Sequence, residues 1–141
     1  MSDPHDLARF VNAQDAGDTY SRALRELRAG RKQSHWMWFV FPQIAGLGHS
    51  PTSRRYAIGA LEEATAYLRH PILGPRLLAC TAALNQIDGR SAEQIFGSID
   101  AQKLRSSMTL FLRAEPAEQA FQQILDRFFG GLPDPATDRL L

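Results

Sequence analysis

Residues 73–87, LGPRLLACTAALNQI, carry the most regular hydrophobic pattern of this chain. Apolar side chains recur at intervals of four, three, four and three residues, at Leu73, Leu77, Cys80, Leu84 and Ile87. An α-helix has 3.6 residues per turn, so this spacing places all five side chains on one face. The pattern therefore predicts a helix that packs this face into a core, with Cys80 as an unreactive thiol within it.

The N-terminal part of the chain shows the same kind of pattern, interrupted by glycine. A first helix is predicted after Ser2 or Asp3, either of which can cap it, and Gly17 ends it. A second helix is predicted over residues 19–29, because its apolar side chains form one stripe and Gly30 follows.

Later helices are predicted from the same spacing combined with capping residues. One spans residues 53–68 with Ser53 as its N-cap, and another spans residues 100–113 with Asp100 as its N-cap. A further helix is predicted with Pro116 in its first turn, where a proline is tolerated, and it runs to the glycine pair at 130–131.

The remaining segments complete an all-helical chain. Ser91 and Gln94 have the spacing of a capping box ahead of a short turn, and residues 132–141 add one last turn. No segment shows convincing strand alternation, and no Asn-Gly or Asp-Gly hairpin joins two β-rich runs. The sequence therefore predicts an all-α fold, a single domain over residues 1–141 built as an orthogonal or irregular bundle of seven or eight helices.

One stretch, SHWMWFVF at residues 34–41, does not fit this pattern. It is apolar on both faces as a strand and nearly all round as a helix, so it must be buried in either form. Pro42 disfavours helical geometry at Phe41, which keeps any helix here short, and the aromatic composition favours a strand. Periodicity leaves the two alternatives open.

Composition limits the classes of protein to be considered. Hydrophobic residues make up 44% of the 141 residues and charged residues 22%, which is typical of a globular domain. No apolar run approaches 18 residues and the N-terminus lacks a signal-peptide pattern, so we expect neither secretion nor a membrane span. The single cysteine excludes an internal disulfide, and a cytoplasmic location is expected.

The net charge of +1 hides an asymmetry along the chain. Residues 22–55 contain seven arginines and lysines and one acid, Glu26, which leaves this segment at +6 and the remainder at −5. Such a distribution within one domain indicates a surface that faces anions. The alternative is a solvated helix face, because Arg22, Arg25 and Arg28 recur every three residues.

The loop GLGHSPTSRR, residues 46–55, combines groups that bind anions. Its glycines allow successive N–H groups to point inward, its serines offer hydroxyl groups, and a helix that starts near Ser53 would direct its positive end there. The loop is neither a Walker A motif nor a dinucleotide fingerprint. No histidine spacing typical of a metal site occurs, and no cofactor is expected.

Three longer motifs resemble one family over nearly the whole chain. They are K-x-S-H-W-M-W-F-x-F-P-Q-x-x-G-L-G-x-S at residues 32–50, EAxxYLxHPxLGxRL at 63–77 and IFGxxDxxKLxSSMTLF at 95–111. They are similar to the bacterial family known as domain of unknown function 1810, some members of which carry an unsupported calpastatin label. The resemblance implies an all-α fold, in which residues 34–41 form a short buried helix, and it implies no activity. The family pattern also retains Gln43, Glu63 and Lys103, which packing alone does not explain.

A fainter resemblance concerns AxxYLxHPxLGxRLLACT together with IFGSxD. This order is similar to a stretch of the ADP-ribose-associated glycosidase family. With the basic segment, it leads to a first hypothesis: the protein binds or hydrolyses a phosphorylated ligand of nucleotide or ADP-ribose type. The candidate ligand-binding residues are Trp36, Gln43, Gly46, Gly48, Ser50, Arg54, Arg55 and Tyr56, and the candidate catalytic residues are His35, Glu63 and Asp100.

A second hypothesis is a noncatalytic module whose basic helix, near residues 22–31, contacts an acidic protein or RNA. A third is that residues 34–41 only build the core and the charge asymmetry has no function. The sequence leaves open whether the protein is an enzyme, and a monomer or weak homodimer is expected.

Overall fold

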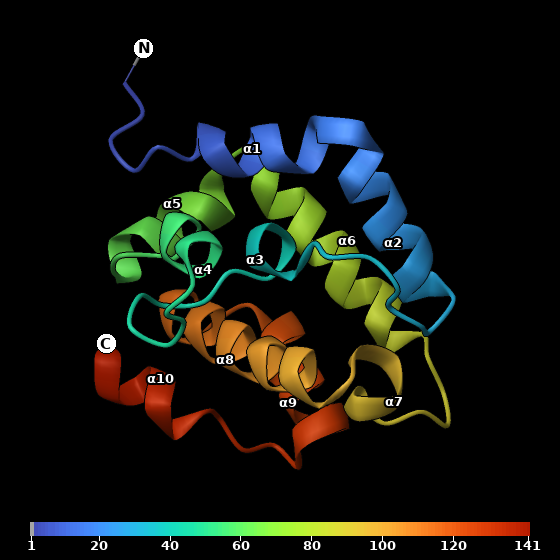
Figure 1. Cartoon of the computed structure of the whole chain (residues 1–141). Coiled ribbons are helices and arrows are strands. Elements are labelled where there is room, and N and C mark those ends of the chain that lie inside the picture. The colour runs from blue at the N-terminus through green and yellow to red at the C-terminus, as the bar shows by residue number, and fades with distance from the viewer. Residues whose placement is uncertain (1) are drawn as a thin grey trace.

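The computed structural model describes residues 2–141, which form ten α-helices and one 3₁₀ turn (Figure 1). The helices are α1 (Ala8–Asp15), α2 (Thr19–Arg28), α3 (Met37–Val40), α4 (Pro51–Arg55), α5 (Leu61–Arg69), α6 (Leu73–Asn85), α7 (Ala92–Phe96), α8 (Ser98–Ala114), α9 (Gln119–Phe129) and α10 (Pro135–Leu140). Seven of them have six or more residues, while α3, α4 and α7 have four or five. The predicted all-α class is confirmed.

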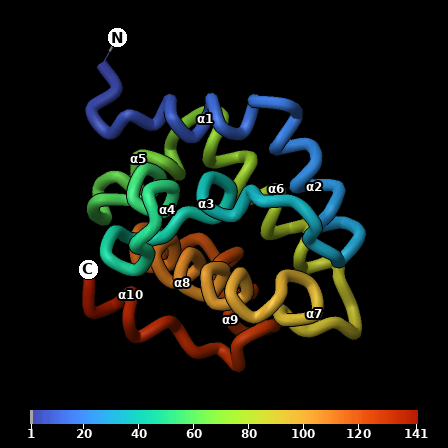
Figure 2. Tube along the Cα trace, in the orientation of Figure 1, coloured from blue at the N-terminus to red at the C-terminus, as the bar shows by residue number. Residues whose placement is uncertain are grey.

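The longest helix, α8, organises the packing. It contacts α5, α7, α9 and α10, while α6 packs against α2, α5 and α9. Figure 2 shows α1 and α2 on one side of the molecule, α8 and α9 on the other, and α3 between them. The five apolar residues of the 73–87 stretch are all buried, as their spacing predicts. Burial also raises the pKa of the Cys80 thiol to about 12, which keeps it protonated and unreactive.

The aromatic stretch at residues 34–41 contains the one-turn helix α3. Trp36, Met37, Val40 and Phe41 are each exposed by 2% or less, and the Trp36 ring packs at an angle against Phe41 and Phe96. The strand that its composition favours is therefore not formed, and the short buried helix implied by the family resemblance is confirmed. Met37 and Val40 are buried within this helix, while Trp38 and Phe39 are half-buried.

The predicted helix over residues 53–68 is wrong as a single element. The chain forms α4 and α5 instead, separated by residues 56–60. Within this break Ile58 is fully buried and forms an isolated parallel bridge with Ile44, in which the Ile58 N–H donates to the Gln43 carbonyl at 2.8 Å. Since Ile58 leaves helical geometry for this partner, two short helices replace the long one.

Several predicted caps also differ from the structure. Ser50 rather than Ser53 caps α4, and Asp100 lies in the first turn of α8, whose N-cap is Gly97. Gly97 has φ +80° and ψ 163°, a conformation that side chains strongly disfavour, so the glycine sets this helix start. The helix predicted around Pro116 begins only at Gln119.

The first helix starts later than predicted, with Leu7 as its N-cap, although the Asp3 carboxylate still accepts hydrogen bonds from the Leu7 and Ala8 amides. Two other capping predictions are confirmed. Ser91 and Gln94 form the reciprocal capping box at α7. Gly130, in the left-handed conformation, ends α9. None of the helices over residues 2–141 is both long and apolar enough to cross a bilayer.

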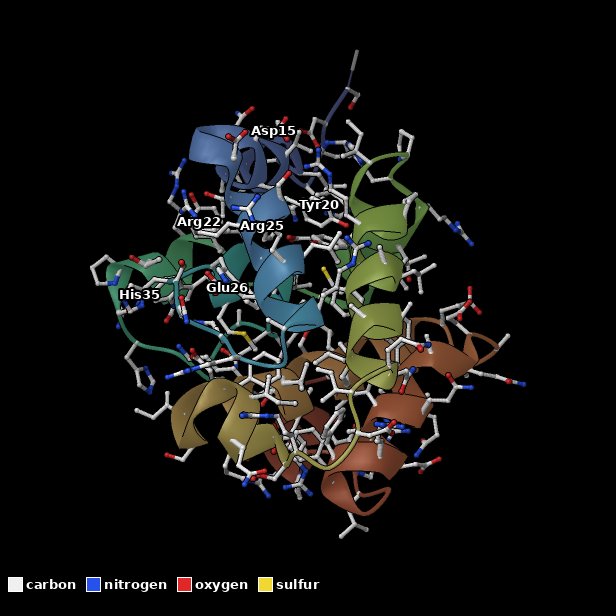
Figure 3. The ribbon with its side chains drawn as sticks, turned by 90° about the vertical axis from the view of Figure 1, so that its right-hand side faces the viewer. Asp15, Tyr20, Arg22, Arg25, Glu26 and His35 are labelled. Carbon is white, nitrogen blue, oxygen red and sulfur yellow. The ribbon has the colours of Figure 1, made fainter. Side chains whose placement is uncertain are left out.

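Glu26, the one acid of the basic segment, fastens the loop before α3 to α2 (Figure 3). Its carboxylate accepts hydrogen bonds from the amides of Gln33 and Ser34 at 2.8 and 2.9 Å, from the Ser34 hydroxyl at 2.6 Å, and from Trp36 Nε1 at 2.9 Å. Burial alone would raise the pKa of Glu26, but these hydrogen bonds outweigh it and lower the pKa to about 2.

Asp134 plays a similar part where α10 joins α8. The residue is 3% exposed. Its carboxylate accepts hydrogen bonds from the hydroxyls of Ser106 and Thr137 at 2.8 and 2.6 Å. It also caps α10 through the amides of Ala136 and Thr137. Burial opposes ionisation, yet the hydrogen bonds prevail and lower the pKa of this carboxyl.

We expect Asp134→Asn to lower the free energy of unfolding by about 1–2 kcal/mol. One carboxylate oxygen accepts from both hydroxyls and from the Thr137 amide, and the NH₂ group that replaces the other oxygen cannot accept from the Ala136 amide or from Gln102 Nε2. Chemical denaturation monitored by circular dichroism measures the change. The exposed Asp126→Asn serves as the matched control and should cost less than about 0.5 kcal/mol. Equal losses in the two variants would contradict the role given to Asp134.

Candidate functional site

Two adjacent cavities lie at the N-terminal end of α8. The first, here called the lysine cavity, has a volume of about 370 Å³ and is lined among others by Lys32, His35, Trp38, Asp100 and Lys103. The second, here called the glutamine cavity, has a volume of about 460 Å³. Its walls include Gln43, Leu47, Gln102 and Ala136. Ser98, Ile99 and Lys103 line both cavities, so the two are adjacent.

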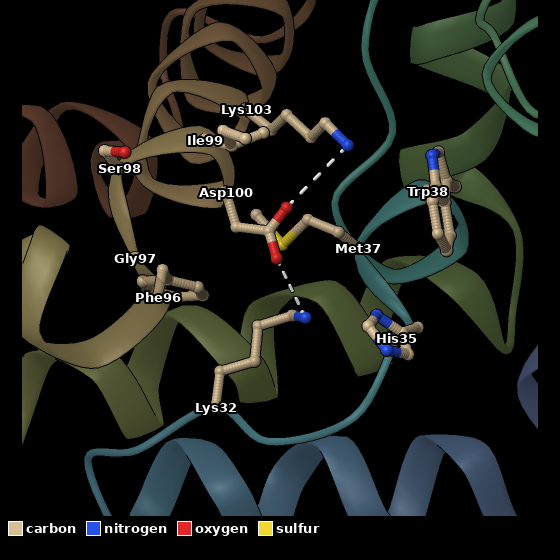
Figure 4. Close-up of a pocket in the computed structure, with 10 residues that line it drawn as sticks. All are labelled: Lys32, His35, Met37, Trp38, Phe96, Gly97, Ser98, Ile99, Asp100 and Lys103. Carbon is tan, nitrogen blue, oxygen red and sulfur yellow. Dashed lines mark ion pairs between the residues drawn. The ribbon is translucent and has the colours of Figure 1, made fainter. Parts of the chain in front are cut away.

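Two lysines converge on Asp100 in the lysine cavity (Figure 4). Lys32 Nζ lies 2.9 Å from one carboxylate oxygen, and Lys103 Nζ lies 3.7 Å from the other. The Lys32 side chain is only 6% exposed, whereas Lys103 and Asp100 are 23% and 22% exposed. Two ammonium groups and one carboxylate give these three side chains a net charge of +1. At 3.7 Å, the Lys103 ammonium group is not tightly paired with Asp100 and can contact another anion.

Aromatic and histidine side chains form the wall opposite Asp100. Figure 4 shows His35 and Trp38 on the same side of the cavity, across from Phe96 and Ser98. Lys103 Nζ lies 5.0 Å from the centre of the Trp38 ring, within cation–π range. His35 is exposed and Trp38 is partly exposed, so both are accessible to a ligand.

The start of α8 adds a partial positive charge to the same place. Gly97, Ser98, Ile99 and Asp100 all line the lysine cavity, and Gly97 offers no side chain to cap the helix. The first N–H groups of a helix have no intrahelical acceptor and carry the positive end of the helix dipole. The 17-residue helix therefore presents backbone donors to the cavity alongside the two lysines.

The structure brings several of the predicted residues to these cavities. His35 and Asp100 line the lysine cavity, while Gln43 and Gly48 line the glutamine cavity. Tyr56 lies beside Gln43 and Trp38 at a third, small cavity of about 10 Å³. Residues from three sequence regions, 32–38, 43–56 and 96–103, thus meet at one place.

Six of the predicted residues line none of the three cavities: Trp36, Gly46, Ser50, Arg54, Arg55 and Glu63. Trp36 is fully buried and donates its indole N–H to Glu26, so its ring is not available to stack on a ligand. Glu63 is 8% exposed and pairs with Arg9 at 2.8 Å while accepting from the Gly59 amide. It lines none of the three cavities. Fastening the 57–59 turn to α1 and α5 explains Glu63 without a catalytic role.

The 46–55 loop has its polar groups turned toward each other. The Ser50 hydroxyl donates to Ser53 Oγ at 2.9 Å and accepts from the Ser53 amide. A Cβ at Gly48 would lie 2.5 Å from the Ser53 Cβ, so close packing accounts for this glycine. Gly46 has φ +106° and packs against Leu140. The helix α4 begins at Pro51. Arg54 and Arg55 therefore occupy its C-terminal turn, and not the positive N-terminal end beside which they were predicted to lie.

Lys32, Trp38 and Lys103 are the site residues that the sequence reasoning did not select as ligand-binding. Lys32 and Lys103 stand 71 positions apart, and only the fold places both beside Asp100. A signal for them was present, because the family motifs retain both lysines and Trp38. Among residues 2–141, no group of three or more His, Cys, Asp or Glu side chains is placed to bind a metal ion.

Comparison with known proteins gives the family. Residues 4–141 match the family described as Protein of unknown function (DUF1810). The chain belongs to the DUF1810 family. A crystal structure at 1.38 Å of a conserved hypothetical protein from Mycobacterium tuberculosis, Rv1873, is similar to it with a TM-score of 0.95 and 57% identity. The alignment covers 99% of this chain and 98% of that one. No curated protein matches the chain.

The DUF1810 family carries no functional assignment in its description, and the Mycobacterium tuberculosis protein is described as hypothetical. The family match confirms the resemblance seen in the three motifs. Every residue that lines the two cavities lies within residues 4–141, so both cavities belong to the DUF1810 domain.

Proposed function

We propose that the protein is a cytoplasmic binding protein for a small phosphorylated molecule of nucleotide or ADP-ribose type, held in the lysine cavity. One observation carries this proposal: Lys32 and Lys103 converge on Asp100 at the uncapped start of α8, inside a cavity. Lysine ammonium groups and helix N-termini are both common phosphate ligands.

The phosphate would bind beside Lys103, the more weakly paired of the two lysines. Lys103 Nζ, at 3.7 Å from Asp100, can turn to a second anion with little loss, and His35 lines the same cavity. Trp38, rather than the buried Trp36, offers an accessible aromatic wall beside the phosphate in this cavity. In this proposal Lys103 takes the phosphate-binding role first considered for Arg54 and Arg55, and Trp38 replaces Trp36 as the aromatic side chain of the site.

Binding is supported more directly than hydrolysis. The Asp100 carboxylate is paired with Lys32 at 2.9 Å and the Glu63 carboxylate with Arg9 at 2.8 Å, so each already serves an ion pair rather than a water molecule. His35 is the remaining acid–base candidate in the cavity. We therefore place Asp100 in the proposal as the group that holds the two lysines in position.

A thermal-shift panel of ADP-ribose, ADP, AMP, ribose 5-phosphate and adenosine tests this function. At a hundredfold excess over its dissociation constant, a ligand adds about 2.7 kcal/mol to the free energy of unfolding, a rise in Tm on the order of 10 °C. We expect the phosphorylated compounds of the panel to stabilise the wild type. Lys103→Met should lower the affinity for these compounds at least about tenfold. Arg54→Ala is the matched control and should bind as the wild type does. A panel in which no phosphorylated compound raises Tm would disprove the proposal.

A second candidate function is supported by the outer face of α2. Arg22, Arg25, Arg28 and Arg31 are all exposed, and none forms a salt bridge with an acid in residues 2–141. Glu26 forms no salt bridge with them among residues 2–141, because its carboxylate accepts hydrogen bonds from the loop before α3. This face suits an acidic protein or RNA. Charge reversal at Arg25 and Arg28 should abolish such binding, whereas Lys103→Met should leave it unchanged.

A further inference from the structure

The glutamine cavity differs from the lysine cavity in its chemistry. Its acid, Asp134, has a carboxylate whose two oxygens are already occupied by two hydroxyls, two backbone amides and Gln102 Nε2. Leu47 and Ala136 make part of the wall apolar, and Ile99, 74% exposed, stands where the two cavities meet. Apart from Lys103 at the shared wall, the surface is suited to an uncharged group.

The side-chain amide of Gln43 remains free to contact such a group, and an unpaired indole N–H lies at the adjoining small cavity. No hydrogen bond within residues 2–141 uses the side-chain amide of Gln43, although its backbone carbonyl is occupied by Ile58. Trp38 Nε1 is buried without a partner among the same residues, and Trp38 shares the small cavity with Gln43. A primary amide offers one acceptor and two donors, which matches the mixed edge of a nucleobase.

We infer that the site takes a two-part ligand, whose phosphate lies in the lysine cavity and whose uncharged heterocyclic ring lies in the glutamine cavity, read by the Gln43 amide and covered by Ile99. Lys103 stands at the shared wall and contacts the phosphate. This inference rests on the proposed function, since the lysine cavity supplies the anionic half. It adds the position of the ring and the residues that select it.

Three compounds separate the two halves by isothermal titration calorimetry: AMP with both parts, ribose 5-phosphate with the phosphate alone, and adenosine with the ring alone. We expect wild-type protein to bind AMP at least about tenfold more tightly than ribose 5-phosphate. Gln43→Leu should reduce the affinity for AMP to that for ribose 5-phosphate, which itself stays unchanged. The matched control Gln86→Leu, at an exposed position on the end of α6, should alter neither affinity.

Ile99→Ala gives a second variant that is safe for folding, because the side chain is exposed. This substitution should lower the affinity for AMP about threefold and leave the affinity for ribose 5-phosphate unchanged. Equal wild-type affinities for AMP and ribose 5-phosphate, or proportional losses for both compounds in the Gln43 and Ile99 variants, would overturn the inference while the phosphate site stands. Failure of both phosphorylated compounds to bind would overturn the proposed function and the inference together.

Discussion

Glu26→Ala is expected to lower the free energy of unfolding by about 3–4 kcal/mol and Tm by about 10–15 °C. The carboxylate accepts four hydrogen bonds that hold the loop before α3, and hydrogen bonds to a charged group contribute about 1.5–3 kcal/mol each without being additive. Its loss also leaves the N–H of the fully buried Trp36 without a partner. Urea denaturation and calorimetry measure both quantities.

The low pKa of Glu26 adds a test by pH. A carboxyl whose pKa falls from 4.5 to about 2 on folding stabilises the native state fully above pH 4.5, and this contribution is lost as the pH falls toward 2. Glu26→Gln should therefore be destabilised at pH 7 and show a smaller loss of stability than the wild type between pH 5 and 2. The exposed Glu62→Gln should keep the wild-type profile. If Glu26→Gln lost stability between pH 5 and 2 in parallel with the wild type, the role given to the ionised Glu26 would be refuted.

Asp100→Ala is expected to cost about 2–4 kcal/mol of unfolding free energy. The substitution leaves the Lys32 ammonium, whose side chain is 6% exposed, with the Ser34 carbonyl but without a counter-charge. Breaking a buried ion pair from one side is costly because the remaining charge stays buried. The measurement is chemical denaturation at neutral pH in the absence of ligand.

A double-mutant cycle with Lys32→Met separates this cause from a general loss of packing. Removing the lysine in the Asp100→Ala background should recover at least about 1 kcal/mol, since no buried charge is then left unpaired. Asp138→Ala, which breaks the half-exposed pair with Arg113, is the control and should cost less than about 1 kcal/mol. Additive losses for Asp100→Ala and Lys32→Met would contradict the coupling.

Local patterns predicted the helices well where each signal lies within one or two turns. The 73–87 stripe, the Ser91–Gln94 capping box and the Gly130 end depend on neighbours three or four residues away, so the sequence contains the full information. The split of residues 53–68 escaped prediction because Ile58 leaves the helix for a partner at residues 43–45. That partner is invisible to a local pattern.

The candidate site shows the same division. The sequence identified the 32–56 region, His35, Gln43 and Asp100, but it could not separate Trp36 from Trp38. Two residues apart, the two rings point to different sides, and only the packing of α3 decides which one is buried against Phe41 and Phe96. Likewise, the basic residues suggested Arg54 and Arg55, whereas the cavity contains Lys32 and Lys103.

By itself, the sequence determined that this protein is all-helical, where its main helices lie, and that its aromatic stretch is largely buried. These properties follow from side-chain periodicity and from covalent neighbours. Only the tertiary structure decided that Glu26 secures the loop before α3, that Glu63 is bound to Arg9, and that Lys32, Asp100 and Lys103 meet at the start of α8. Such ion pairs join distant segments, and their partners depend on how helices pack rather than on where each helix begins.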